Sequence, residues 1–82
     1  MWHLKTRLGV FWVVPVKEGK KSRFVLGVNE DELAFYTDVE EAARDVHDQN
    51  TGFLKWDSQP VVKAPVHIAE WAIGEPKMWN KN

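Results

Sequence analysis

Residues 35–52 constrain the fold most, because this stretch alone has the complete pattern of an α-helix. Its apolar side chains recur at the i, i+3, i+4, i+7 spacing that lines one face of a helix. They are Val39, Ala42, Ala43 and Val46. The pattern predicts one helix over about 38–50, with the rest of the chain packed on it as strands and loops.

The two ends of this helix carry recognisable signals. Thr37 with Glu40 forms a capping box, and Asp38 with Glu41 offers the same arrangement one residue later, so two N-caps stay open. Acidic side chains in the first turn suit the positive end of the helix dipole. Gly52 lies where the chain leaves the helix, and a glycine adopts the positive φ of such an exit at little cost.

The segments before the helix have the patterns of β-strands. Residues 2–8 alternate apolar and polar side chains with period two, whereas residues 10–16 are apolar on both faces, as in a central strand. Residues 23–28 and 33–36 continue as strands. Because the connections are short polar turns, neighbouring strands should be antiparallel. The sequence predicts an α+β domain: a three- or four-stranded antiparallel meander packed on one helix.

The chain after the helix is harder to assign. Residues 53–57 fit either another edge strand or an aromatic cluster packed on the core. Pro65 is well placed to open a short helical turn that runs through Trp71. We predict a single domain over 1–76 and a frayed tail over 77–82.

The composition narrows the class of protein. The chain has 82 residues and no cysteine, so a disulfide framework is excluded and a reducing, cytoplasmic location is expected. The apolar run 10–16 is far shorter than the roughly 18 residues of a membrane helix, and no small-residue cleavage site follows it. We therefore predict no membrane association. The oligomeric state stays open.

Charge is unevenly distributed along the chain. Residues 1–23 carry six lysines and arginines against one glutamate, a net charge of +5. Residues 29–48 carry eight carboxylates against one arginine, a net charge of −7. A surface with two such poles orients association with a charged partner.

Residues with catalytic or metal-binding chemistry form no recognisable set. His3, His47 and His67 share no ligand spacing, and His47 falls at the edge of the apolar helix stripe as a partly buried structural histidine would. Ser22 and Ser58 lie in polar turns with no base at a recognisable spacing. We therefore predict no metal, no cofactor and no enzymatic activity.

Five tryptophans are many for a chain of this length. We expect Trp2, Trp12 and Trp56 in the core. Trp71 and Trp79 fit either a buried position or an exposed one, and exposed tryptophans are typical of binding hot spots.

Basic side chains gather in the first part of the chain, and the predicted strand pairing would bring them to one end of the sheet. A nucleic-acid interface needs such a basic footprint, although the pI of about 6.3 is low for that class. A solvated strand face explains the same residues. The candidate binding residues are Lys5, Arg7, Lys20, Lys21, Arg23, Trp71 and Trp79.

Over most of its length, the chain resembles a set of small uncharacterised bacterial proteins, through a pattern that begins at the last predicted strand. The shared pattern is Tyr36-x-x-x-x-Glu41-Ala42-Ala43-x-Asp45-Val46, then Thr51-Gly52, Trp56-Asp57 and Glu70-Trp71. The resemblance implies a compact domain and no known activity.

A second resemblance is local. Tyr36, followed by residues 40–44, is similar to the joint between the third strand and the helix of the plant AP2 DNA-binding domain. The likeness covers about ten residues and implies a three-stranded antiparallel sheet packed on one helix. The arginine and tryptophan motifs with which AP2 domains read DNA have no match in this chain.

Together these patterns favour a non-enzymatic, cytoplasmic interaction module of bacterial or phage origin. It would bind a protein partner through its charged surface and late tryptophans. The alternative is a nucleic-acid-binding domain that uses the basic residues between 3 and 23. A third hypothesis, a small enzyme, would require a concave pocket near His47.

Overall fold

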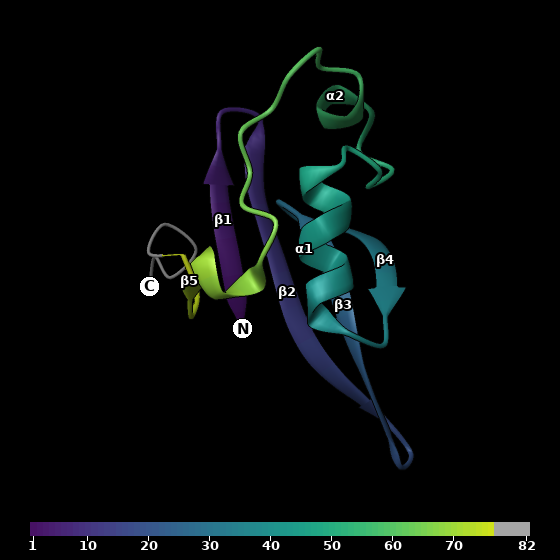
Figure 1. The fold of residues 1–82 in the computed structure, drawn as a ribbon. Coiled ribbons are helices and arrows are strands. Elements are labelled where there is room, and N and C mark those ends of the chain that lie inside the picture. Colours follow the sequence, from purple (N-terminus) through teal and green to yellow (C-terminus); the bar gives the residue numbers. More distant parts are fainter. Residues whose placement is uncertain (77–82) are drawn as a thin grey trace.

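The structure, a computed structural model, describes residues 1–76, so the predicted tail 77–82 and Trp79 lie outside the described residues. Its elements follow one another along the chain as shown in Figure 1. They are β1 (Trp2–Thr6), β2 (Gly9–Glu18), β3 (Lys21–Val28), β4 (Asp31–Tyr36), α1 (Val39–His47), α2 (Leu54–Asp57), the 3-10 turn η1 (Ile68–Glu70) and β5 (Ala72–Ile73).

The strands form one antiparallel sheet in the order β4-β3-β2-β1-β5. The first four strands are joined by tight hairpin turns, which confirms the predicted antiparallel α+β class. The predicted count of three or four strands is wrong, because β5 adds a fifth. Ala72 and Ile73 alone form β5, where they pair with His3 and Trp2 of β1. Two residues are too few to show the alternation that reveals a strand.

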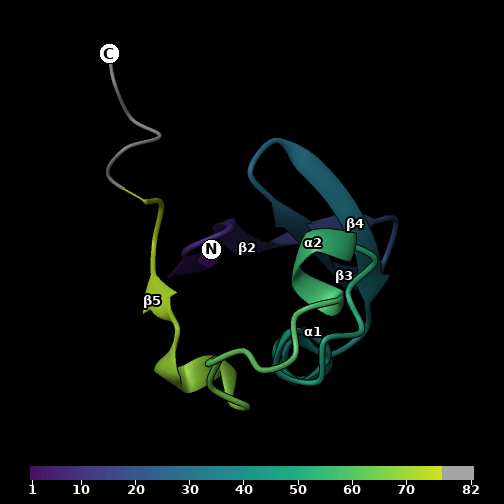
Figure 2. The same ribbon diagram turned by 90° about the horizontal axis from the view of Figure 1, so that it is seen from above.

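Both helices and the coil that follows them cover the same face of the sheet (Figure 2). α1 turns its predicted apolar stripe inward, where Ala42, Ala43 and Val46 are fully buried. The inward side chains of β2 and β3 meet this stripe and are also buried. They are Phe11, Val13, Leu26 and Val28. The core therefore lies between the sheet and α1, as the helix periodicity predicts.

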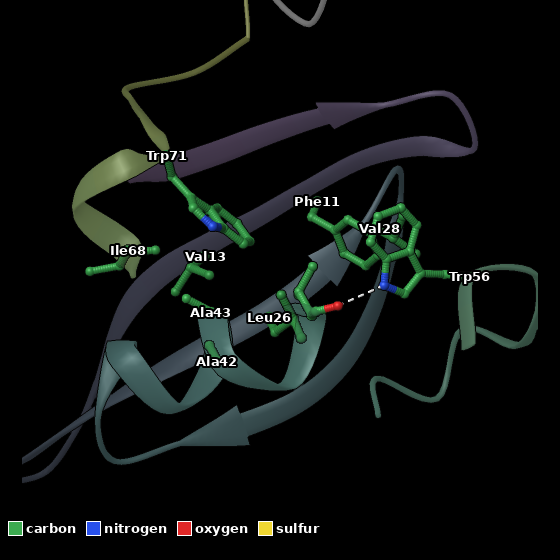
Figure 3. Close-up of a cluster of buried hydrophobic side chains, with 10 residues drawn as sticks. Phe11, Val13, Leu26, Val28, Ala42, Ala43, Trp56, Ile68 and Trp71 are labelled. Atoms are coloured by element: carbon green, nitrogen blue, oxygen red, sulfur yellow. Dashed lines mark hydrogen bonds between the residues drawn. The ribbon is translucent and has the colours of Figure 1, made fainter. Parts of the chain in front are cut away.

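Two tryptophans close the ends of this core (Figure 3). The Trp56 ring packs edge-on against Phe11 with 5.0 Å between ring centroids, and its indole N–H donates to the Val46 carbonyl over 2.8 Å. Trp71 reaches the core from the other side and is only 3% exposed. Of the two positions predicted for Trp71, buried or exposed, the structure has the buried one.

The bounds of α1 differ slightly from the predicted 38–50. Of the two candidate N-caps, Asp38 is used, since its carboxylate accepts from the Glu40 N–H over 2.9 Å. The helix ends at His47, and the chain exits through Gln49, whose φ is +60°. The Gln49 side chain holds this exit by donating to the carbonyls of Trp56 and Gln59. Gly52 also has a positive φ, but in the next turn.

Within 53–57, Leu54–Asp57 form the short helix α2, so this segment is not an edge strand. Asp57 stabilises the loop before it, because its carboxylate accepts from the Thr51 N–H, the Thr51 hydroxyl and the Gly52 N–H. The Thr51 hydroxyl in turn accepts from the Phe53 N–H over 3.0 Å. These bonds satisfy polar groups that a strand would have placed in the sheet ladder.

Trp12 lies outside the core, contrary to the sequence prediction. The period of two places it on the sheet face opposite the helices, where its ring covers Gly27 of the neighbouring strand. Its indole N–H donates to the Asn29 carbonyl over 2.7 Å. Within residues 1–76, no helix combines the length and apolar character that crossing a bilayer requires.

Candidate functional site

A groove of about 690 Å³ opens between the β1–β2 turn, α2 and the coil that follows α2. This volume falls in the range of ligand-binding pockets. We use "the groove" for this hollow and its lining residues. They are Lys5, Thr6, Arg7, Leu8, Trp56, Gln59, Val61, Val62 and Lys63.

The first wall of the groove is the turn between β1 and β2. The Thr6 hydroxyl accepts from the backbone N–H groups of Leu8 and Gly9, each over 3.2 Å, and donates to the Gly9 carbonyl over 2.6 Å. Three bonds on one hydroxyl fix the turn. Lys5 and Arg7 flank Thr6 on this rigid segment, and both are exposed.

The second wall is the coil 59–63, whose first residue is held by the segment that follows α1 and by α2. The Gln49 side chain donates to the Gln59 carbonyl over 2.6 Å, and the Gln59 side chain donates to the Lys55 carbonyl over 2.9 Å. Trp56 forms the floor, since its ring is anchored in the core. The turn is thus fixed by bonds within the chain, and the coil is anchored at Gln59.

The lining gives the groove a definite chemistry. Among the residues that the structure describes, the lining includes three cations, Lys5, Arg7 and Lys63, and no carboxylate. Its other side chains include Leu8, Val61 and Val62, and Val61 is 79% exposed. A partner that carries both negative charge and apolar groups complements such a surface.

The remaining predicted basic residues lie at the opposite end of the molecule, so the expectation of a single basic cluster is wrong. The β1–β2 turn adjoins the start of β2, whereas the β2–β3 turn follows its end. Ten residues of β2 separate them, about 30 Å at the rise of a strand. Figure 1 shows the β2–β3 hairpin extending beyond the rest of the fold.

We call residues 17–23 the hairpin tip. It carries four cations against Glu18, and Arg23 is paired with that glutamate over 3.2 Å. The side chains of Arg23 and Glu18 are 41% and 59% exposed, so solvent screens the pair and it contributes little to stability. Lys20 and Lys21 of the candidate set are exposed on the tip.

The edge of the sheet beside the groove is only partly covered. β5 pairs with Trp2 and His3 of β1 and reaches no further along that strand. On this side of β1, no strand of the described part of the chain pairs with residues 4–6. Lys5 and Thr6, which line the groove, therefore lie on an open sheet edge.

The histidines occupy three separate environments. Nδ1 of His3 is 2.6 Å from the Gly74 carbonyl in a buried site. His47 is exposed beside Asp48, not partly buried as expected, and Nδ1 of His67 lies 3.8 Å from Glu40. Across residues 1–76, no three His, Asp or Glu side chains converge as a metal site would require. His47 does not line the groove.

The structure thus divides the candidate residues. Lys5 and Arg7 line the groove, Lys20, Lys21 and Arg23 lie on the hairpin tip, Trp71 is buried, and Trp79 is outside the described residues. Lys63, Val61 and Val62 also line the groove, and they were not among the predicted residues because their local sequence carries no binding signal. Searches of protein-family models, curated proteins and solved structures find no match to this chain.

Proposed function

We propose that this protein is a small non-enzymatic interaction module that binds an acidic segment of a protein partner in the groove. The carrying observation is the lining itself, in which Lys5, Arg7 and Lys63 meet without a carboxylate around an apolar floor. Charge complementarity of this kind steers association and selects the partner, while the apolar contacts provide affinity.

The residues that support binding of a protein partner are not the same in the structure as in the sequence-based hypothesis. Trp71, proposed there as a contact residue, is 3% exposed and supports the core. Trp56 lines the groove, but it is only 4% exposed and, like Trp71, belongs to the core. The charge difference along the chain remains part of the proposal, but the groove uses only one of its two basic ends.

A second candidate function is nucleic-acid binding through the hairpin tip. The observation that favours it is the projection of a basic hairpin away from the body of the fold (Figure 1). Two-stranded β-ribbons fit into nucleic-acid grooves, and lysines at such a tip would contact phosphates. Binding of this kind would weaken steeply with salt.

Two matched charge-reversal variants test these functions against each other. The groove variant combines Lys5→Glu, Arg7→Glu and Lys63→Glu, and the tip variant combines Lys17→Glu, Lys20→Glu and Lys21→Glu. Both replace three exposed cations by three carboxylates, so they change the net charge equally. The measurement is capture of partners from nuclease-treated cell extract by immobilised wild type and variants, with quantification by mass spectrometry.

We expect one acidic protein to be enriched by wild type and by the tip variant and lost with the groove variant. Equal loss with both variants would indicate non-specific charge attraction and contradict the proposal. Retention of a short DNA duplex, offered separately to the immobilised proteins at low salt and lost only with the tip variant, would instead support the second function. Circular dichroism of both variants serves as the check that they fold.

A further inference from the structure

We infer that the partner's acidic segment binds as an added β-strand on the open edge of β1, with acidic and apolar side chains in alternation. This inference rests on the proposed function, since it specifies how the groove is used. Its occupant is an extended peptide segment of another protein. Strand addition to an exposed sheet edge is a recurring mode of peptide recognition.

The backbone of β1 leaves hydrogen-bonding groups free at the groove. The Gly74 N–H donates to the Met1 carbonyl over 2.7 Å, so the polar groups of Met1 point towards β5. In an antiparallel ladder every second residue points to the same side. His3 and Lys5 therefore point to this edge too. β5 pairs with His3 but ends before Lys5, whose N–H and carbonyl are left for an incoming strand.

Side-chain alternation sets the chemistry of that strand. Lys5 lies on the opposite sheet face from Leu4, which packs against the core cluster. In an antiparallel pairing, the direction β5 takes, residues directly opposite each other share a face. The peptide residue opposite Lys5 would be acidic, and its neighbours would direct apolar side chains towards Leu8, Val62 and Trp56.

The same residues discourage indiscriminate pairing. A lysine on an exposed edge is a common protection against aggregation with uncharged strands. Lys5 here would oppose neutral or basic strands and accept an acidic one, while Arg7 and Lys63 add to the preference from the turn and the coil. The edge is also short, so affinity would depend on the apolar contacts as well as on backbone bonds.

The test uses short blocked peptides of alternating glutamate and valine, titrated into the isotope-labelled full chain and followed by backbone amide shifts. One peptide is unmodified, a second is N-methylated at its glutamates and a third at its valines. A fourth replaces glutamate by lysine. The geometry assigns the glutamate N–H groups to β1 and the valine N–H groups to solvent, so the two methylated peptides are matched controls.

We expect the unmodified and valine-methylated peptides to shift the amides of residues 5–8 and 59–63 and to slow hydrogen exchange at the Lys5 N–H. Methylation at the glutamates removes the backbone bonds to β1 and should weaken binding about tenfold or more. The Lys5→Glu variant should weaken binding of the unmodified peptide to a similar extent, and the lysine peptide should not bind.

Equal binding of the two methylated peptides would overturn strand addition and leave the proposed function intact. Strand addition would also be overturned, and the proposed function left intact, if no peptide binds while the acidic protein is still captured through the groove. If the groove amides shift on raising the protein concentration alone, the occupant is a second copy of the chain and the inference is wrong. Groove shifts with DNA and none with any peptide would overturn both the inference and the proposed function.

Discussion

At the level of single residues, Trp12 packs on Gly27 on the sheet face that the helices leave uncovered. Gly27 stands where a Cβ would overlap the six-membered ring of the Trp12 indole. The ring lies flat across the strand and is held by its bond to the Asn29 carbonyl. Trp12 was expected in the core because its side chain is large and apolar. The sequence does not show which face of a strand the helices cover, so this expectation was wrong.

The Gly27→Ala variant should be destabilised by about 2–3 kcal/mol, because the new methyl group has to displace the indole ring from its packed position. Urea unfolding measures the change. In a Trp12→Ala background the same substitution should have little effect, since the obstacle is gone. If Gly27→Ala destabilises both backgrounds equally, the contact with Trp12 is not its cause.

Tyr36 provides a pH-dependent test at a single group. Its hydroxyl donates to the Asp45 carboxylate over 2.7 Å. Burial, followed by this bond and the charge of Asp45, raises the pKa of Tyr36 above its ordinary value of about 10. The unfolded chain then ionises first as pH rises, so the contribution of Tyr36 to stability is complete below pH 10 and declines above it.

We therefore expect the free energy of unfolding to fall above about pH 10 in the wild type and to fall less in the Tyr36→Phe variant. At neutral pH that variant should be less stable by about 1 kcal/mol, the usual value of one such hydrogen bond. Tyr36 is the only tyrosine, so absorbance of the tyrosinate reports its ionisation directly. Ionisation at the ordinary pH would refute this description of its surroundings.

At the scale of elements, the sequence reveals those parts whose pattern is local. The periodicity of the helix, the alternation in β1 and the continuous apolar run in β2 predicted the positions of these elements, and Asp38 was one of two predicted caps. The chain after residue 52 was less predictable, because distant partners determine its structure. Trp56 is held by Val46 and Phe11, and η1 by Glu40, and no short stretch of sequence shows these contacts.

Glu40 illustrates such a contact. The helix spacing suggests an ion pair with Arg44, but the Glu40 carboxylate instead accepts from the Ile68 N–H over 3.0 Å. This bond caps η1 and fastens the segment that carries Trp71 and β5 to α1. Two other contacts have similar structural roles, since the Tyr36 hydroxyl donates to Asp45 and the Asp57 carboxylate accepts from Thr51.

The Glu40→Gln variant should lose about 0.5–1 kcal/mol of stability, a reduced value because the carboxylate is 40% exposed. The more specific expected result is faster hydrogen exchange at the Ile68 amide, which loses its charged acceptor. Glu41→Gln is the control, because Glu41 is its exposed neighbour on the same helix. Unchanged exchange at Ile68 would show that the cap does not hold η1.

At the scale of the whole molecule, the topology separates basic residues that the sequence places close together. Lys5 and Lys20 are 15 positions apart, yet they lie at the two ends of β2. In contrast, Lys63 joins Lys5 and Arg7 across most of the chain length. Part of the site could therefore be predicted from composition and strand pattern, but its assembly depends on the path of the coil after α2.

The central claim is that the groove, and not the hairpin tip, is the binding surface for an acidic partner. Its most direct test is a parallel titration of the labelled protein with an acidic peptide of glutamate and valine and with a short DNA duplex at low salt. We predict saturable amide shifts at residues 5–8 and 59–63 with the peptide. Shifts confined to residues 17–23, produced by DNA alone and reversed by salt, would contradict the claim.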